Sequence, residues 1–327
     1  LFELKRWIKN PLFYVYLALF FVISLLIMGS SLGIFDQATV TASTPVKLNS
    51  PMQISGMLNA LSIFVYFLLP TIIGASIYRD FQYNVHQLLY SYKLSKSAYL
   101  SAKFLSSLLI ILAVTLATVL GFYGAQFLPG VNADLLGPNN LWSYLQAYVL
   151  FVIPNLILFG SLVFALVTFS RNIYVGFIFI LFLFVLQSFL AGITSSMDNR
   201  YLAALIDPFG FQALEYSTQY WSVEEQNVNN LPFTGAILWN RAIWLACSAL
   251  VLVLVYRSFS FTFAGLSWGK AKKAERVTKN NFGSIVTVKL PEIKLDYTFF
   301  SRLKTAWFLS KNDFKSMIRN WTFIVIM

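Results

Sequence analysis

The sequence has few charged residues: Asp, Glu, Lys and Arg together make up 11% of the 327-residue chain. Soluble domains contain about 25% charged residues, whereas 58% of this chain is hydrophobic. The apolar residues form long uninterrupted runs of about 20 residues, which is the length that a helix needs to cross the hydrocarbon core of a bilayer. The composition excludes a soluble globular protein and predicts an all-α polytopic membrane protein.

Cysteine and histidine are nearly absent, with one residue of each. The single Cys247 excludes an internal disulfide framework and a thiolate metal cluster, and its apolar neighbourhood predicts a small buried core residue. The single His86 excludes a metal site built from several histidines of this chain. We therefore predict no metal site and no cofactor-binding residue in this chain.

Two kinds of motif with known chemistry are missing as well. The sequence contains no paired-cysteine metal site and no DxD-type cluster. Gly265–Ala271 superficially suggests a phosphate loop, but it has three rather than four residues between its glycines and ends in Ala. The predicted spans carry no Asp, Glu or His in mid-span, which weighs against an ion-coupled transporter. We expect no catalytic residue here, and any ATP and Mg²⁺ must be bound by another chain.

Six apolar runs predict membrane spans. The second contains Pro70 and Gly74, which favour a kink, and the fourth contains Pro154. A polar loop, Ser31–Met57, is predicted between the first two spans. The predicted spans are Leu12–Ser30, Leu58–Tyr78, Phe104–Phe127, a stretch within Trp142–Phe169, Ile173–Ile193 and Ala236–Tyr256.

Three segments flank the six-span region, which comprises residues 11–256. Residues 1–10 are a basic amphipathic lead-in, residues 257–320 a basic linker, and residues 321–327 the start of a seventh span. Residues 313–327 resemble residues 3–17 at an offset of 310, which predicts a tandem protein with a second half. The alternative is chance similarity between two helices that lead into a membrane.

The segment Thr194–Gly235 is too polar to span a membrane. It contains the sequence DPFG at Asp207–Gly210 and three aromatic residues, Tyr216, Tyr220 and Trp221. Because Tyr and Trp favour the lipid headgroup region, we predict interfacial or re-entrant helices here.

Positive charges are distributed unevenly between the two sides. If the amino terminus is cytoplasmic, 21 of the 24 Lys and Arg residues lie in cytoplasmic segments, and only Lys47, Arg200 and Arg241 lie outside or near the outer span ends. The positive-inside rule therefore predicts a cytoplasmic amino terminus and a multi-pass protein of the inner or plasma membrane. The net charge of +11 then reflects membrane orientation, and we predict no nucleic-acid partner.

Arg79–Lys103 is a polar interval between the second and third spans, and it predicts a short amphipathic cytoplasmic helix. We expect Asp80 near the helix amino terminus, where a carboxylate suits the helix dipole. His86 is predicted to be a surface or partner-facing side chain. The predicted apolar face consists of Phe81, Val85, Leu88, Leu89 and Tyr92, and Gln82, His86, Gln87 and Lys93 lie off it.

This interval resembles the type-2 family of ABC export permeases, whose pattern is an acid after span two, Leu-Leu, Pro-x-Ser/Thr-Arg/Lys, and Gly-Lys. Asp80, Leu88-Leu89, Lys93-Leu94-Ser95-Lys96 and Ala102-Lys103 match it, with Lys93 in place of Pro and Ala102 in place of Gly. DPFG and Tyr220–Asn227 also resemble a subgroup of tandem permeases, some fused to a zinc aminopeptidase.

The resemblance implies a six-span exporter half with cytoplasmic lead-in and coupling helices. In this family the coupling helix docks on a separate ABC ATPase subunit, and the expected partners are these subunits, a second permease half in the same chain or a homodimer mate, and membrane lipid. The implied docking residues are Asp80, His86, Gln87, Leu88, Leu89, Lys93, Ser95 and Lys96.

Two other function classes remain open. A membrane anchor or scaffold would tether an enzyme or an assembly and transport nothing. An integral-membrane enzyme acting on lipids or glycans would need polar catalytic residues near the interface. Acids on the predicted outer side could serve, and solvated loop acids are the alternative; they are Asp198, Asp207, Glu215, Glu224 and Glu225.

Overall fold

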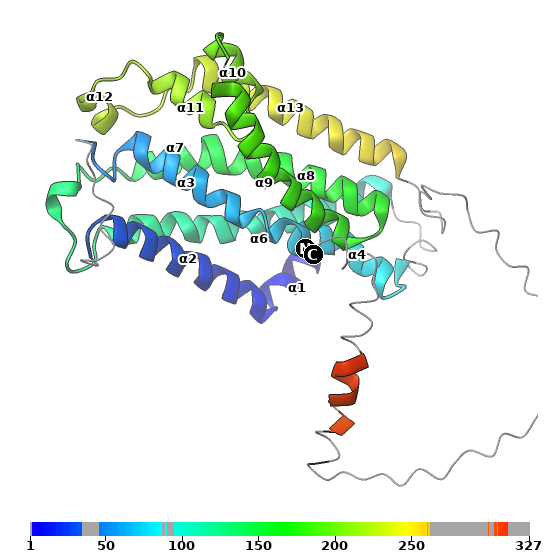
Figure 1. The fold of residues 1–327 in the computed structure, drawn as a ribbon. Helices are drawn as coiled ribbons and strands as arrows, with labels where there is room; N and C mark the ends of the chain where they lie inside the picture. Colours follow the sequence, from blue (N-terminus) through cyan, green and yellow to red (C-terminus); the bar gives the residue numbers. More distant parts are fainter. Residues whose placement is uncertain are drawn as a thin grey trace, which may run out of the picture. The chain divides into compact units, whose positions relative to one another are not determined.

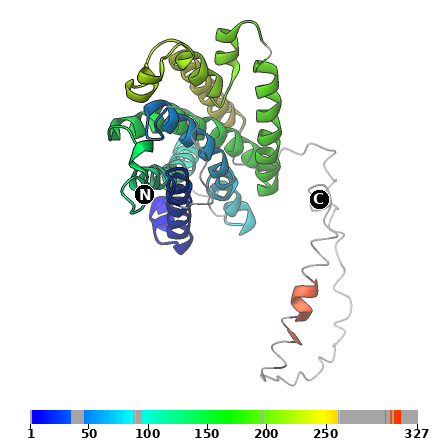
Figure 2. The same cartoon turned by 60° about the vertical axis from the view of Figure 1, so that its left-hand side comes forward.

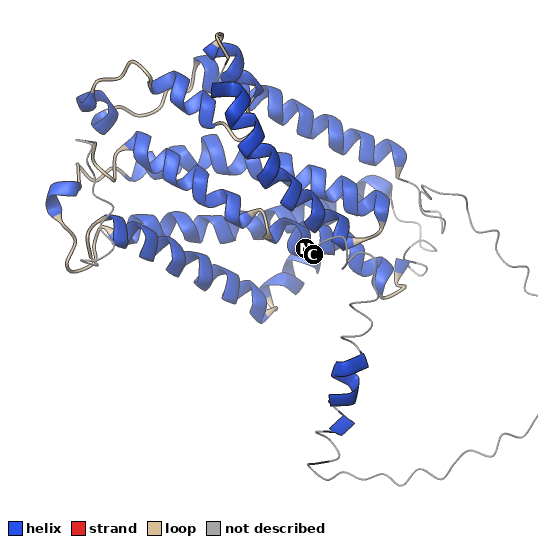
Figure 3. Ribbon diagram, in the orientation of Figure 1, coloured by secondary structure: helices blue, strands red, loops and turns tan. Residues whose placement is uncertain are grey.

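The computed structural model describes residues 2–34, 46–86, 89, 95–195, 197–259, 261, 300, 304–305 and 307–312. Every regular element in these residues is a helix, as Figure 3 shows. The chain divides into two compact units, Leu1–Gly265 and Leu266–Met327. The helices discussed below all belong to the first unit.

Five of the described helices are long and apolar enough to cross a membrane, and a bent pair makes a sixth when it is counted as one span. The protein is therefore an all-α, multi-pass membrane protein. Its elements (Figure 1) are α1 (Phe2–Ile8), α2 (Pro11–Ser31), α3 (Pro51–Val65), η1 (Pro70–Gly74), α4 (Ala75–Gln82), α6 (Lys96–Ala125), η2 (Ala133–Leu135), α7 (Leu141–Ala147), η3 (Tyr148–Val152), α8 (Ile153–Ser170), α9 (Ile173–Ser195), α10 (Arg200–Ile206), α11 (Phe211–Thr218), α12 (Val223–Val228) and α13 (Gly235–Ser258).

Short polar side chains begin the first two long helices. The Asn10 side chain accepts a hydrogen bond from the N–H of Leu12 at 3.1 Å, and Pro11 occupies the first turn of α2. Ser50 caps α3 in the same way, and Pro51 follows it. Proline suits this position because its missing N–H would have no partner within the helix. The predicted first span agrees with α2 to within one residue at each end.

The second span differs from its prediction. Its helix begins at Pro51, so the predicted loop is wrong over residues 51–57. The polar residues there do not mark a loop, because Ser55 is buried and donates to the carbonyl of Pro51 at 2.7 Å. A bend of 47° separates α3 from the helix that starts at Pro70, and residues Pro70–Gly74 form a π-helix. The predicted kink near Pro70 is confirmed.

The remaining long helices start and end close to the predicted bounds, with one exception. The third span begins at Lys96 rather than at Phe104, because Ser95 caps a helix that continues into the polar interval. The fourth span is one continuous helix, Leu141–Ser170. Pro154 lies in the first turn of α8, directly after the π-helix η3. A widened turn precedes the proline within this helix.

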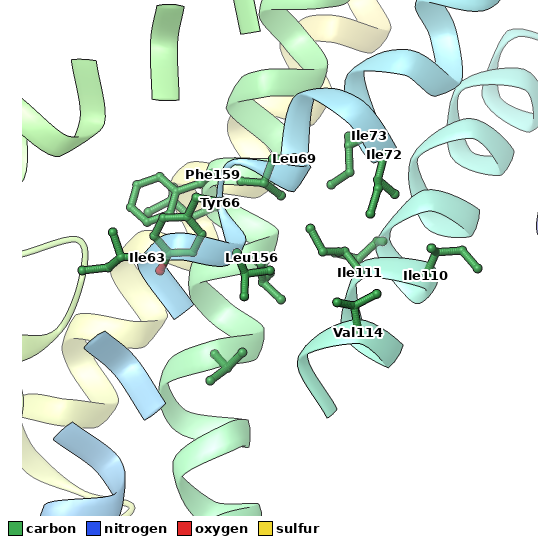
Figure 4. Packing of buried hydrophobic residues seen from close by; sticks show 14 of the residues in the cluster. Ile63, Tyr66, Leu69, Ile72, Ile73, Ile110, Ile111, Val114, Leu156 and Phe159 are labelled. Atoms are coloured by element: carbon green, nitrogen blue, oxygen red, sulfur yellow. The ribbon is translucent and has the colours of Figure 1, made fainter. Parts of the chain in front are cut away.

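The centre of the bundle is formed by α6 and the α7–η3–α8 helix. In their most apolar stretches 61% and 72% of the residues are buried, against 17% in α9, which lies at the rim. Figure 4 shows branched side chains of η1 and α6 facing each other, with α8 residues alongside. The core residues labelled there come from the second span, α6 and α8, and are Ile63, Tyr66, Leu69, Ile72, Ile73, Ile110, Ile111, Val114, Leu156 and Phe159.

A close helix contact joins α2 to α6. A Cβ atom added to Gly121 would lie 2.0 Å from the Ser24 hydroxyl oxygen and 2.5 Å from the carbonyl oxygen of Phe21. Only glycine permits this approach, which is typical of small residues between membrane helices. The contact holds the first span against the central helix.

Three short helices occupy the segment between α9 and α13. Figures 1 and 2 show α10 and α11 beside α13, and α10 and α11 contact each other and α13. Ala204 and Leu214 from this segment pack with Phe151 and Ile237 in a second, smaller core. The predicted helical character of the segment is confirmed, and its depth in the membrane stays a prediction.

Candidate functional site

The interval between the second and third spans is not one continuous helix. α4 ends at Gln82, and a turn follows in which Asn84 has a φ of +56°. Asparagine tolerates this left-handed conformation better than most residues, and it interrupts the helix. Beyond this turn, the N–H of Leu89 donates to the carbonyl of Val85 at 2.9 Å. The predicted short amphipathic helix, with its apolar face from Phe81 to Tyr92, is therefore wrong at this point, because the turn at Asn84 interrupts that face.

Asp80 lies in the last turn of α4, not in the first turn of a helix. The expected stabilisation by the helix dipole is wrong, because a carboxylate there meets the negative end of the dipole. Its partners are instead two side chains of α6. The Tyr99 hydroxyl donates to one carboxylate oxygen at 2.7 Å, and the Lys103 ammonium donates to the other at 3.1 Å.

Lys103 also binds an acid of the lead-in helix. Its ammonium donates to Glu3 of α1 at 2.5 Å, and Arg6 lies 3.7 Å from the second oxygen of Glu3. We call Glu3, Asp80, Tyr99 and Lys103 the Lys103 cluster. The side chains of Lys103, Asp80 and Glu3 are only 7%, 10% and 14% exposed. One buried ammonium thus joins α1, α4 and α6, and charges that are shielded from water interact strongly.

His86 is buried, so its prediction as a surface side chain is wrong. Its Nδ1 atom lies 3.1 Å from the Asp80 carbonyl oxygen, and its ring lies 5.1 Å from that of Phe81. The guanidinium of Arg171 lies 4.6 Å from the Phe81 ring centroid. Arg171 connects α8 to α9, so these aromatic contacts tie the end of α4 to that connection.

The other predicted docking residues have different surroundings. Gln87, Leu88 and Lys93 lie outside the described residues. Leu89 is partly buried and packs against the main core. Ser95 is exposed, and its side chain accepts a hydrogen bond from the N–H of Ala98.

The last of these residues, Lys96, is half-buried and contacts α13. It donates to the carbonyl of Arg257 at 3.4 Å and lies over the Tyr256 ring. Asp80 and His86 therefore face the protein interior, while Ser95 and Lys96 lie at or near the surface. Docking of a partner on this interval stays a prediction.

A second polar cluster surrounds Arg241 in α13, which is only 4% exposed. Its Nη1 donates to the Asn155 side chain at 2.7 Å. Asn155 in turn donates to the Asn59 side chain at 3.1 Å and to the carbonyl of Phe209 at 3.0 Å. Asn59 also donates to the Phe209 carbonyl at 3.0 Å. We call Asn59, Asn155, Phe209 and Arg241 the Arg241 cluster.

The DPFG sequence forms a turn whose Phe209 carbonyl accepts the hydrogen bonds of Asn59 and Asn155. The Asp207 carboxylate accepts hydrogen bonds from the N–H groups of Phe209 and Gln212, each at 2.9 Å. Gly210 has a φ of +86°, and a Cβ atom there would lie 1.9 Å from Nη2 of Arg241. The glycine therefore permits both the left-handed turn and the close approach of the guanidinium.

Sequence reasoning missed the Arg241 cluster, since it counted Arg241 only as a charge near an outer span end. Arg241 and Arg257 lie on the same helix, α13, and are 16 residues apart, which corresponds to about 24 Å along the helix. Because Arg257 contacts Lys96, Arg241 lies about 24 Å from the end of α13 that meets the docking interval. The available signal was the presence of Asn59, Asn155 and Arg241 inside otherwise apolar runs. Polar residues at such positions need partners from other helices.

Several single-residue expectations can be compared with the structure. Cys247 is exposed on α13, so its prediction as a buried core residue is wrong. Asp207 is 5% exposed and binds backbone N–H groups, which corrects its interpretation as a solvated loop acid. Glu225 forms a capping box with Ser222 at the start of α12. Within the described ranges, no group of three or more His, Cys, Asp or Glu residues is placed to hold a metal ion.

Comparison of the chain with protein-family models, with curated proteins and with solved structures gave no match.

Proposed function

We propose that this chain is the membrane permease subunit of an ATP-driven exporter of the type-2 ABC family. The proposed topology has six spans, with α3 and η1–α4 as one bent span. The protein lies in the inner or plasma membrane, and its amino terminus is cytoplasmic. A separate ABC ATPase subunit docks on the interval between α4 and α6. ATP and Mg²⁺ are bound by that subunit.

The Lys103 cluster is the observation that carries this proposal. Asp80 lies in the last turn of the second span and Lys103 begins the apolar part of the third, so the two residues bracket the proposed docking interval. Their contact at 3.0 Å joins the two ends of the interval at a buried base. The added contact to Glu3 links this base to the lead-in helix. A force on the loop is thereby transmitted to three helices at once.

The sequence pattern supports the same assignment. The acid, the leucine pair, Ser95-Lys96 and Lys103 have the order and spacing of the family pattern. The bent second span also supports a moving role, because residues Pro70–Gly74 form a π-helix and π turns recur at functional sites. The excess of Lys and Arg in the proposed cytoplasmic segments supports the orientation.

Affinity purification of the tagged full-length protein from its own cells tests the docking interval. We expect vanadate-sensitive ATP hydrolysis to co-purify with the wild type. The double variant Lys93→Glu/Lys96→Glu should reduce the co-purified activity about tenfold, which corresponds to about 1.4 kcal/mol of binding free energy. The matched control Lys5→Glu/Lys9→Glu makes the same charge change on the exposed side of the lead-in and should retain the activity.

Two outcomes would contradict the proposal. Equal co-purification of the ATPase with both double variants would show that the docking interval is not part of the interface. A wild-type protein that carries no ATPase but retains another enzyme would support the membrane anchor instead. Elution of each variant at the wild-type volume in size-exclusion chromatography is the control for folding.

A further inference from the structure

A groove of about 540 Å³ lies beside the Lys103 cluster, between α1, the end of α4 and the start of α6. Its wall is mostly apolar and aromatic, and its charged residues come from all three helices. Tyr83 and Val85 at its edge are 68% and 40% exposed. The Lys103 cluster, Arg79 and Ala102 are among the residues that line it.

The position of the groove places it at a membrane surface. α2 has 21 residues and is therefore about 32 Å long, which matches the hydrocarbon thickness of a bilayer. α1 directly precedes α2, so α1 lies at the level of the lipid headgroups. An exposed tyrosine such as Tyr83 is typical of that level. The groove is thus accessible to the headgroup and the upper chain of a phospholipid.

The charges of the groove leave one cation without an acidic partner. Lys103 binds both Asp80 and Glu3, and Arg6 lies near Glu3. Arg79 contacts the ring of the buried Trp7, with 5.0 Å between its Cζ atom and the ring centroid. Its guanidinium makes no hydrogen bond or ion pair with any other residue that the structure describes. The two acids and three cations leave a net charge of +1.

We propose that this groove binds an anionic phospholipid, with the phosphodiester on the Arg79 guanidinium and the glycerol and upper acyl chain along the apolar wall. A planar guanidinium can donate two parallel hydrogen bonds to a phosphate. The apolar wall favours a lipid over a free phosphate ion, because an ion would leave that surface exposed to water. This inference concerns the membrane surface alone and does not depend on export or on the ATPase.

Native mass spectrometry of the purified full-length protein tests the site with phosphatidylglycerol and phosphatidylcholine as probes. We expect phosphatidylglycerol to bind at least about fivefold more tightly than phosphatidylcholine. Arg79→Gln should remove most of this preference, and Arg79→Lys should retain part of it because a point charge remains. Lys9→Gln removes one charge from an exposed residue on the same lead-in and should change the affinity less than about twofold.

A second variant tests the groove itself. Ala102 lines the groove and is exposed, so Ala102→Phe should fill it and weaken phosphatidylglycerol binding. The proposal is overturned if Ala102→Phe binds normally, if the two lipids bind equally, or if Arg79→Gln keeps the preference. Displacement of the lipid by millimolar inorganic phosphate would overturn it too, since the site would then be a phosphate site. If Arg79→Gln does not fold, Arg79→Lys and Ala102→Phe decide the outcome.

Discussion

The Lys103 cluster and the Arg241 cluster each bury a cation, and they stabilise it in opposite ways. Lys103 has two carboxylates within 3.1 Å, from Glu3 and Asp80. Arg241 donates one hydrogen bond to the neutral Asn155, and its Nε and Nη2 atoms have no hydrogen-bond partner among the described residues. The Phe151 ring lies 5.4 Å from its guanidinium. Lys103 thus neutralises two carboxylates, whereas the charge of Arg241 is only partly compensated by its hydrogen bond to Asn155.

This difference decides what each cation contributes to stability. If Lys103 is removed, two buried carboxylates lose their counter-charge, and an isolated buried charge is strongly destabilising. If Arg241 is removed, the hydrogen-bond partner left behind is the neutral Asn155, and the nearby Asp207 carboxylate keeps its two backbone N–H donors. The cost of burying the guanidinium disappears as well. Two buried cations in one protein can therefore have very different mutational costs.

Lys103→Met gives the largest expected effect. It should lower the free energy of unfolding by about 3–5 kcal/mol, because Glu3 and Asp80 remain buried without a cation. The apparent melting temperature in detergent measures the effect, with Lys9→Met as the control at an exposed site. The double variant Lys103→Met/Asp80→Asn should recover part of the loss. Equal melting temperatures for Lys103→Met and Lys9→Met would contradict the account of the Lys103 cluster.

Gly210→Ala should give the next largest effect. Alanine in the left-handed region costs about 1–2 kcal/mol, and its Cβ would also displace the guanidinium of Arg241, which adds about 1–3 kcal/mol of overpacking. Gly130→Ala is the matched control, since Gly130 has a φ of +88° and open space around its Cβ position. Thermal unfolding should show a larger loss at Gly210. A loss no larger than that of Gly130→Ala would argue against the close contact with Arg241.

Asn155→Leu should destabilise the protein by about 1–3 kcal/mol, because it leaves the Arg241 guanidinium and the Asn59 side chain with fewer partners. The exposed Asn139→Leu serves as the control, because Asn139 makes a single side-chain hydrogen bond, to Tyr123. Chemical unfolding in mixed micelles would measure both. A smaller effect for Asn155→Leu than for Asn139→Leu would mean that Asn155 does not stabilise the Arg241 cluster.

Arg241→Met should have the smallest effect, less than about 1 kcal/mol, since the lost hydrogen bond to Asn155 is offset by the removal of a buried charge. The ratio of this effect to that of Lys103→Met sharpens the comparison most directly. Melting curves of the two variants, recorded together in the same detergent, give that ratio. A loss for Arg241→Met as large as that for Lys103→Met would mean that the two cations act alike.

The membrane class and most helix bounds could be predicted from the sequence, because long apolar runs and capping residues act locally. The first span is an example, with its Asn10-Pro11 start. Two of the failures share one cause. Residues 51–57 and Asp80 were interpreted from their polarity, which predicts exposure or a cap, whereas buried partners satisfy them in the structure. Those partners lie elsewhere on the same helix or on a different one.

The candidate site shows the same division. The order Asp80, Leu88-Leu89, Ser95-Lys96 and Lys103 is visible in the sequence and led to the proposed docking interval. The burial of His86 and the turn at Asn84 were not visible, because amphipathic periodicity in Arg79–Lys103 is compatible with one helix. A single residue with positive φ breaks such a helix without changing its hydrophobic pattern.

The sequence by itself determined that this protein is helical and crosses a membrane several times, because hydrophobic length and scarce charge depend only on local composition. Only the tertiary structure decided which polar residues meet inside it. Glu3 and Lys103 are 100 residues apart, and Asn155 and Arg241 are 86 apart. Contacts over such separations depend on how the helices pack. A polar group buried in an apolar environment needs a hydrogen-bond partner, and the neighbouring helix supplies it.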